Sequence, residues 1–407
     1  MKIEVDPQTS FDGLGIAPQV LSILDKLKFF HPTPIQQKAI PSGIEGKDMV
    51  GIAQTGTGKT LAFAIPMVQR LAGMQPKGRG LVLVPTRELA MQVEETYRKI
   101  VPTFQMQSTV VIGGASMNEQ INALRRHPQI IIATPGRLMD HMNQRTVTLN
   151  DVKILVLDEA DRMLDMGFQP QIEKILRSVP RERQTMLFSA TMPGPISKIA
   201  AQYMKLPIQI EIAPSGTLAE KLTQEVFIVK SENKKELLRK ILAQYRGSVL
   251  IFSRTKIGAH RTARVIREMG YPAADIHSDR SLAQRKEALQ GFKNGRYRIL
   301  VATDIAARGI DVTGIELVIN YDLPEDAENY VHRIGRTGRA GHKGHAISFA
   351  MPDQGTDVKS IENLIRAVLP ISEHPEVPGE KFSAPMRFSF SPRGRRGPTR
   401  PRRPFRR

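Results

Sequence analysis

Short apolar runs alternate with longer amphipathic stretches along most of the chain. The apolar runs are continuous and rich in branched residues, which is typical of strands buried on both faces of a parallel sheet. The stretches between them, such as residues 88–101, space their apolar residues as helices do. The pattern therefore predicts repeated strand–helix units. The ten expected strands lie at residues 48–53, 80–85, 129–134, 153–160, 185–190, 248–253, 273–278, 298–304, 316–322 and 345–350.

The repeat is interrupted around residues 207–222, where proline and glycine break the pattern. Because strand–helix repeats occur on both sides of the interruption, we expect two α/β domains, each built on a parallel sheet. A short linker joins them. The expected boundaries are 1–207 for the first domain, 208–222 for the linker, 223–370 for the second domain and 371–407 for a flexible tail.

Composition narrows the classes of protein that fit this pattern. The 407 residues include no cysteine, which excludes disulfide scaffolds, cysteine-bound zinc and thiol catalysis. No apolar run approaches the roughly 20 residues that a membrane helix needs. The N-terminus lacks the basic and then apolar pattern of a secretory signal. A cytoplasmic protein is expected.

The chain is strongly basic, and the charge is unevenly placed. A net charge of +19 favours a polyanionic partner, either nucleic acid or an anionic membrane surface. Residues 383–407 hold nine arginines, five prolines, three phenylalanines and no acid, so they cannot build a core. A disordered basic arm is expected there. Arginine beside phenylalanine suits RNA, because guanidinium groups pair with phosphates and both groups stack on bases. A merely solubilising end is the alternative.

A phosphate-binding loop is expected after the first strand, where the sequence reads AQTGTGKT. Gly56 and Gly58 allow a tight turn whose backbone N–H groups face phosphates, while Lys59 reaches the β- and γ-phosphates. The Thr60 hydroxyl is expected to ligate Mg²⁺. The strict pattern has glycine where this chain has Ala53, and a chance glycine-rich turn is the alternative. The expected nucleotide-binding residues of the loop are Ala53, Gln54, Thr55, Gly56, Thr57, Gly58, Lys59 and Thr60.

Two carboxylates end a later apolar strand. Asp158 and Glu159 lie about 100 residues beyond the phosphate loop, and the carboxyl ends of parallel strands line the ligand crevice of an open sheet. We assign Asp158 to Mg²⁺, and Glu159 to orienting and deprotonating the attacking water. An acidic residue at this position can also simply cap the following helix.

Residues 158–161 read D-E-A-D, and together with the phosphate loop they make the chain resemble DEAD-box RNA helicases of superfamily 2. The resemblance covers residues of about 10 to 350 and implies two RecA-like domains in tandem. The short basic tail and compact length are similar to bacterial RhlE-like members. Further family blocks, in family order, are PTRELA (85–90), GG (113–114), TPGR (134–137), SAT (189–191), LIFSRT (250–255), TDIAARGIDV (303–312) and HRIGRTGR (332–339).

The block PTPIQ resembles the family's adenine-reading segment and ends at Gln36. An amide offers adenine one donor and one acceptor, which favours ATP over GTP, although Gln36 alone could be an ordinary surface amide. The resemblance places Phe29 against the base, Phe11 at the family's upstream aromatic position and Asp311 at the ribose. Lys28 stands where the family usually has glycine, and we expect it to loosen the local turn.

The resemblance makes Arg336 and Arg339 arginine fingers, which would reach the γ-phosphate and stabilise its developing charge. The complete ATPase site is then expected only when the two domains close. By residue type alone, these arginines would suit a solvated basic turn, and hydroxyls after a strand would suit a helix cap. The residues expected to couple closure to work on RNA are Asp161, Ser189, Ala190, Thr191 and His332.

The expected RNA contacts suit phosphates and sugars rather than bases, so binding should be independent of sequence. Two positions depart from the family: Ser278 replaces a glycine, and Leu282 replaces the glutamine of a Q-x-x-R pair. The loss of that glutamine puts half of the pair in doubt, while an Arg285–phosphate contact is still expected. The residues that the resemblance assigns to RNA are Pro85, Thr86, Arg87, Gly114, Thr134, Arg137, Arg254, Arg285 and Thr303.

The function expected from the sequence is ATP-dependent separation of short RNA duplexes, or remodelling of ribonucleoprotein, by a monomeric clamp that uses Mg²⁺. A DNA helicase with the same core is a second hypothesis, which stimulation of ATPase activity by RNA but not DNA would exclude. A non-catalytic RNA clamp is a third. The intact Lys59, Glu159, Arg336 and Arg339 argue against it.

Overall fold

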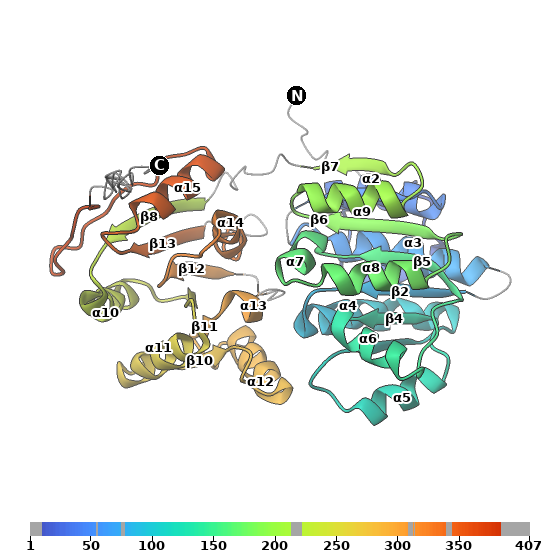
Figure 1. Ribbon diagram of the computed structural model, residues 1–407, viewed down its shortest axis with the longest axis horizontal. Coiled ribbons are helices and arrows are strands. Elements are labelled where there is room, and N and C mark those ends of the chain that lie inside the picture. Colours follow the sequence, from blue (N-terminus) through green and yellow to red (C-terminus); the bar gives the residue numbers. More distant parts are fainter. Residues whose placement is uncertain are drawn as a thin grey trace, which may run out of the picture.

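The computed structural model describes residues 10–53, 56–74, 78–212, 222–307, 312, 314–338 and 344–383. Two α/β domains lie side by side along the longest axis of the molecule (Figure 1). Each is built on one sheet in which all strand pairs are parallel. The expectation of two tandem α/β domains is confirmed.

The sheet of the first domain has seven strands in the order β3-β4-β2-β5-β6-β1-β7. The order reverses direction beside β1, and such a reversal opens a crevice at the carboxyl ends of the strands. The strands are β1 (Met49–Ile52), β2 (Arg79–Leu83), β3 (Ser108–Val111), β4 (Ile130–Ala133), β5 (Val152–Leu157), β6 (Gln184–Ser189) and β7 (Ile208–Glu211).

Helices cover both faces of this sheet, because successive strand residues face opposite sides. Val82 packs in a cluster with α1 to α4, whereas Leu81 packs in a second cluster with α6 to α9. The helices are α1 (Pro18–Lys26), α2 (Pro34–Ile44), α3 (Lys59–Gly73), α4 (Arg87–Ile100), α5 (Met117–Arg125), α6 (Pro135–Asn143), α7 (Ala160–Asp165), α8 (Gln169–Ser178) and α9 (Gly194–Tyr203), with a 3₁₀ turn at Val101–Phe104.

The second domain repeats this layering around a sheet of six strands in the order β10-β11-β9-β12-β13-β8. One apolar cluster joins the sheet to α12, α14 and α15, and another joins it to α10 and α11. The strands are β8 (Leu222–Ile228), β9 (Ser248–Phe252), β10 (Ala273–Ile276), β11 (Ile299–Ala302), β12 (Ile315–Asn320) and β13 (Gly344–Ala350). The helices are α10 (Lys234–Gln244), α11 (Lys256–Glu268), α12 (Leu282–Lys293), α13 (Asp304–Ala307), α14 (Ala327–Ile334) and α15 (Gly355–Ile365), with a 3₁₀ turn at Ser231–Asn233.

Two expected boundaries differ from the structure. The linker was expected to start at residue 208, but β7 pairs with β1 from Met49↔Ile208 to Ile52↔Glu211, so its residues belong to the first sheet. Residues 213–221 lie outside the described residues.

The flexible tail was expected to start at residue 371, but residues 371–383 lie on the second domain. The Ser372 N–H donates to the Val226 carbonyl at 2.9 Å, and Val377 is buried in the second domain's core. Residues 384–407, which carry the tail's nine arginines, lie outside the described residues.

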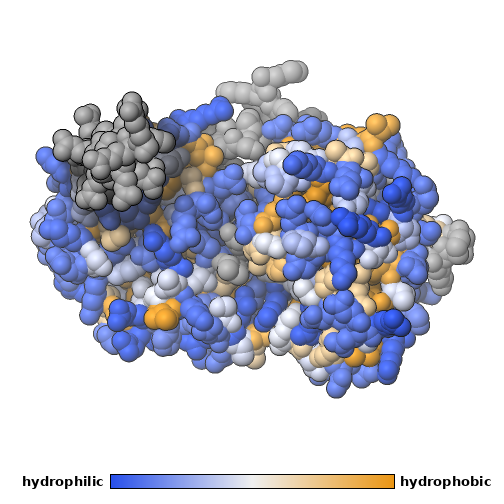
Figure 2. All heavy atoms as spheres, viewed as in Figure 1, coloured by the Kyte–Doolittle hydropathy of each residue, from blue (hydrophilic) through white to orange (hydrophobic). Residues whose placement is uncertain are grey.

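On the face shown in Figure 2, the described surface is mainly hydrophilic. In the view of Figure 2, apolar residues are scattered among polar ones over both domains. Of the helices within the described ranges, none is long and apolar enough to cross a membrane.

Candidate active site

The phosphate loop connects β1 to α3 at the carboxyl end of the central strands. Gly56 and Gly58 have φ angles of 86° and 89°, a conformation that L side chains rarely adopt. Lys59 is the first residue of α3, and its buried Nζ donates to the Ala53 carbonyl at 3.0 Å. The ammonium group therefore lies across the loop at a helix N-terminus, where an anion is favoured.

The side chain of Gln36 joins α2 to this loop. Its Oε1 accepts from the Thr33 N–H at 2.9 Å, and its Nε2 donates to the Gly58 carbonyl at 3.0 Å. A Cβ at Gly58 would lie only 2.5 Å from the same Nε2. The amide expected to read adenine is thus held directly beside the loop expected to bind phosphates.

The two aromatic residues assigned to ATP lie in different environments. Phe29 follows α1 and is 45% exposed, so its ring can be reached by a ligand. Phe11 is buried in the first domain's core cluster. Of the phosphate-loop residues assigned to the nucleotide, Gln54 and Thr55 lie outside the described residues.

Asp158 and Glu159 directly follow β5. In the sheet, β6 lies between β5 and β1, the strand that leads into the phosphate loop. The Asp158 Oδ1 accepts from the Glu159 N–H at 3.0 Å. Burial raises the pKa of the Asp158 carboxyl, and Lys59 only partly opposes this effect. Glu159 itself has φ of 51°, a strained angle for a residue with a side chain.

Glu159 pairs with a buried arginine one helical turn away. Its Oε2 accepts from Nη1 of Arg162, and both side chains are at least 95% buried. Burial alone would raise the pKa of Glu159. The nearby charges of Arg162, Lys59 and Arg336 outweigh burial and lower it, so the carboxylate stays ionised at neutral pH.

Asp161 connects α7 to the residues after β6. Its Oδ2 accepts from the backbone N–H groups of Ala190 at 2.9 Å and Thr191 at 3.0 Å, and from the Thr191 hydroxyl at 3.2 Å. Its own N–H donates to the Ser189 hydroxyl at 3.3 Å. The expected coupling residues of the first domain therefore form one hydrogen-bonded unit.

Helix α14 of the second domain meets α7 of the first at a small cavity. His332 and Arg336 line it together with Arg162. Burial, and then the charge of Arg162, lower the pKa of His332, which keeps the ring neutral at neutral pH. Of the other residues assigned to the second domain's part of the ATP site, Arg339 and Asp311 lie outside the described residues.

The residues assigned to RNA lie mostly at the ends of strands and starts of helices. Thr86 and Thr134 are the N-caps of α4 and α6, and Pro85 precedes the first of these caps. The Thr303 N–H donates to the Ile276 carbonyl at 3.3 Å, just beyond β11. These positions lie at the carboxyl ends of strands in the two sheets.

Three of the assigned arginines lie close to nearby backbone or acid groups. The guanidinium of Arg87 lies over Gly114, where an added Cβ would come within 2.2 Å of Nη1. Arg137 donates to the Ala115 carbonyl at 3.0 Å. Arg254 donates through its backbone N–H to Asp322 at 3.1 Å.

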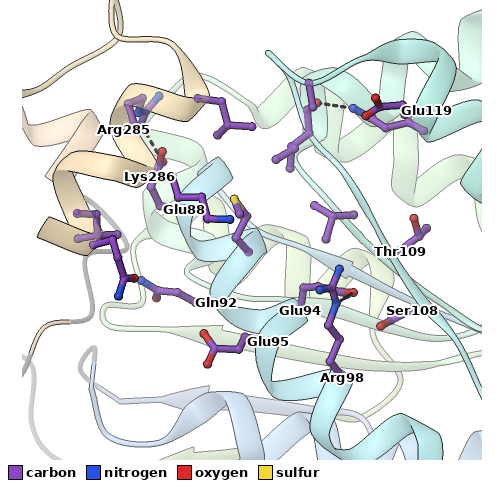
Figure 3. A pocket seen from close by; sticks show the side chains of 18 of the residues that line it. Glu88, Gln92, Glu94, Glu95, Arg98, Ser108, Thr109, Glu119, Arg285 and Lys286 are labelled. Carbon is purple, nitrogen blue, oxygen red and sulfur yellow. Dashed lines mark hydrogen bonds and ion pairs between the residues drawn. The ribbon is translucent and has the colours of Figure 1, made fainter. Parts of the chain in front are cut away.

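Arg285, also assigned to RNA, contacts the first domain instead. Its Nη2 lies 2.7 Å from the Glu88 Oε2 across the boundary between the domains, and both side chains are more than 90% buried. Figure 3 shows this ion pair between α12 and α4. Burial lowers the pKa of Arg285 and raises that of Glu88, so the two groups depend on each other's charge.

Sequence reasoning missed three charged residues at these sites. Glu88 stands within PTRELA and Arg162 directly follows D-E-A-D, so their positions in the blocks were the available signal. Arg333 lies in HRIGRTGR; its Nε and Nη2 bind the Asp304 carboxylate at 2.6 and 2.7 Å, and its Nη1 binds the Asp322 carbonyl. Arg333 thereby attaches α14 to the second domain's core.

The donor set fits magnesium. Asp158 offers a buried carboxylate, and its raised pKa shows that the surrounding positive charge does not compensate burial. The hydroxyl of Thr60, the second residue of α3, is also a hard oxygen ligand. A divalent cation bound by these two groups would stabilise the charged carboxylate.

Comparison with known proteins tests the family resemblance. A model of the DEAD/DEAH box helicase family matches residues 33–199, and one of the helicase conserved C-terminal domain matches residues 233–341. The chain is 44% identical over 355 residues to the ATP-dependent RNA helicase CshA of Listeria monocytogenes, covering 87% of this chain and 68% of that one.

The structure is similar to that of S. cerevisiae Dbp5 bound to RNA and ADP BeF3, with a TM-score of 0.80, 31% identity and coverage of 89% of this chain and 95% of that one. A DEAD box protein from Methanococcus jannaschii is 36% identical over 89% of this chain and 99% of that one, but its TM-score is only 0.53. The resemblance expected from the sequence is confirmed, and the chain belongs to the DEAD-box family of ATP-dependent RNA helicases.

Proposed function

We propose that this chain couples closure of its two domains on ATP and RNA to local strand separation, and that ATP hydrolysis reopens it. The observation that carries the proposal is that the ATPase groups come from both domains. Glu159 and Arg162 of the first domain lie beside His332 and Arg336 of the second, close enough for Arg336 to lower the pKa of Glu159. Hydrolysis can then proceed only in the closed arrangement.

In the first domain, the loop from Ala53 to Thr60 would bind the triphosphate, and Lys59 would exchange the Ala53 carbonyl for a phosphate oxygen. Gln36 already faces the loop and would pair with adenine through its remaining donor and acceptor. Asp158 and Thr60 would hold Mg²⁺, which when bound neutralises developing charge on the phosphates.

Glu159 would orient the attacking water. Its lowered pKa keeps it an acceptor at neutral pH, and its pairing with Arg162 fixes its direction. Arg336, and Arg339 beyond the described residues, would stabilise charge on the transferred phosphoryl group. Arg333 fixes the helix that directly precedes Arg336.

RNA would lie across the threonine N-caps of the first domain and near Thr303 of the second. It would be held by its backbone, which explains binding without base reading. A closed clamp that bends one strand separates a short duplex, because a stiff duplex cannot follow the bend. We propose that it acts on RNA in the cytoplasm, as a monomer.

The test is ATPase activity of Glu159→Gln with single-stranded RNA. The amide keeps the size of the side chain but loses its charge, so we expect turnover to fall by about 100-fold or more, while ATP and RNA still bind together. Glu173→Gln on α8, a half-buried residue paired with Arg177 away from the site, is the matched control and should retain wild-type turnover. Normal turnover in Glu159→Gln would refute the assignment.

The same assay separates the other two hypotheses. Stimulation of wild-type turnover by DNA as strongly as by RNA would favour a DNA helicase. RNA binding without any turnover would favour a passive clamp.

A further inference from the structure

Leu282 belongs to the second domain but packs against the core of the first. It is the first residue of α12, and it joins the cluster that contains Ile112 and the partly buried Met91 and Ala115. The same residues line a cavity of about 740 Å³ between α4, β3, α5 and α12. Figure 3 shows how α12 approaches α4 across this cavity.

Arg285, one helical turn after Leu282, lies on the same side of α12. Residues three apart are neighbours on a helix surface, so the apolar side chain and the guanidinium meet the first domain together. The Arg285–Glu88 pair is an ionic contact at 2.7 Å. The contact between the domains at α12 therefore has one charged and one apolar component.

The apolar component of this contact depends on the leucine at position 282. An amide at position 282 would have to give up water or find a polar partner on leaving solvent, whereas leucine gains free energy when its apolar surface is covered. Leu282 packs against the apolar cluster of the first domain. Met91, Ile112 and Ala115 of that cluster line the cavity with it, among polar residues such as Glu88. A leucine at this position thus favours the arrangement in which the domains are together.

We infer that Leu282 is an apolar interdomain anchor that makes part of the closure free energy independent of salt and of charge on bound RNA. Leu282 is a positioning residue: closing α12 onto α4 brings Arg336 toward Glu159. The inference rests on the proposed function, because it assumes that closure assembles the ATPase site. Ionic contacts weaken with salt, but apolar contacts between neutral groups do not.

The experiment measures closure by energy transfer between two dyes on the full chain. Because the chain has no native cysteine, Lys198→Cys on α9 and Ser360→Cys on α15 give one exposed labelling site in each domain. Single-stranded RNA and a non-hydrolysable ATP analogue induce closure. The variants are Leu282→Gln, Leu282→Met, and Val368→Gln as a control at a second-domain residue that is 79% exposed.

We expect Leu282→Gln to lower the closure equilibrium constant about three- to tenfold. The ratio of this constant to that of wild type should be the same at about 50 and 300 mM salt. Leu282→Met keeps an apolar side chain and should close like wild type. In ATPase assays, Leu282→Gln should raise the RNA concentration for half-maximal rate and leave the rate at saturating RNA near wild type. Val368→Gln should match wild type in every assay.

Two results would overturn the anchor. If Leu282→Gln closes as readily as wild type, or if its deficit disappears at high salt, Leu282 contributes no apolar closure energy and the proposed function is unaffected. If wild type shows no change in energy transfer with analogue and RNA, the proposed coupling fails and the anchor fails with it. Equal melting temperatures of the variants would confirm that they are folded.

Discussion

Lys28 adopts a conformation that suits glycine. It follows α1 with φ of 61°, its N–H donates to the Asp25 carbonyl, and the Phe29 N–H donates to the Leu24 carbonyl, each at 2.9 Å. These two bonds form a Schellman motif, in which a left-handed residue ends a helix. The expected loosening of this turn does not occur, because both hydrogen bonds are made. The consequence of having lysine instead of glycine is a strained backbone at Lys28.

Replacing Lys28 by glycine should therefore stabilise the protein. A left-handed residue with a Cβ costs about 1–2 kcal/mol, part of which is offset by glycine's greater freedom in the unfolded chain. We expect Lys28→Gly to add about 0.5–1 kcal/mol and raise the melting temperature of the first domain by about 1–4 °C. Thermal unfolding followed by circular dichroism measures this change.

Lys26→Gly is the matched control. Lys26 is exposed like Lys28, but it is the last residue of α1 and has a helical conformation. Glycine there should destabilise by about 0.5–1 kcal/mol, so the two substitutions should shift the melting temperature in opposite directions. A fall in melting temperature for both variants would contradict the strain at Lys28.

The sequence predicts the backbone conformation of the phosphate loop well, because a tight turn of this kind needs glycine. Gly56 and Gly58 have the positive φ angles that a tight phosphate loop requires. It cannot predict the Glu88–Arg285 pair, because the two residues lie 197 positions apart in different domains and each is common on protein surfaces. Their burial arises only from the placement of the domains.

At the scale of secondary structure, the strands that the pattern missed are edge strands. All ten expected strands are present, but β3, β7 and β8 were not predicted, and each lies at the end of a sheet. An edge strand is only partly buried, so its residues need not form a continuous apolar run. This explains why the linker was expected to start too early, within what is β7.

Helix α14 should make closure depend on pH. Its His332 faces Asp161 and Arg162 of α7, Glu159 at the end of β5, and Arg336 just beyond its own helix; burial, then Arg162, lowers its pKa from the usual 6.5. The open form therefore binds the proton more readily than the closed form. Closure is fully favoured above about pH 6.5 and weakens as pH falls below it, by up to about tenfold at pH 5.5.

His332→Gln isolates this effect, since glutamine does not titrate. The dye-labelled chain, closed with RNA and the ATP analogue, should open between about pH 6.5 and 5.5 in wild type, and the variant should lack this component. Protonation of Asp158, whose pKa is raised by burial, acts in both proteins and cancels in the comparison. The same pH response in both proteins would show that His332 is not the titrating group.

At the scale of the whole molecule, the structure is similar to RNA- and nucleotide-bound Dbp5 over both domains. Two contacts described above join them: α7 with α14 at the ATPase site, and α4 with α12 at Leu282 and Arg285. One assembles the catalytic groups, and the other lies away from them. Closure can therefore be weakened at the second contact without altering the chemistry at the first.

The placement of residues 371–383 separates the fold from the basic tail. Val377 is only 5% exposed, and the Ser383 N–H donates to the Pro352 carbonyl at 2.7 Å. Ending the chain after Ser383 should thus preserve the second domain, whereas ending it after Pro370 should lower its melting temperature, because the apolar contacts of Val377 are lost. Burial of one such side chain is worth about 1.5–3 kcal/mol.

The chain that ends after Ser383 then tests the role of the tail's positive charge. Removing residues 384–407 takes away nine of the nineteen excess positive charges. Each arginine that contacts a phosphate of single-stranded RNA contributes about 0.7 to the slope of log affinity against log salt concentration. If about three to five of the nine make such contacts, the slope should flatten by about 2–3.5, and RNA affinity at low salt should fall at least about tenfold. RNA titrations of both chains at several salt concentrations measure this change, with melting temperature as the check on folding. An unchanged slope would mean that the folded domains alone provide the ionic contacts to RNA.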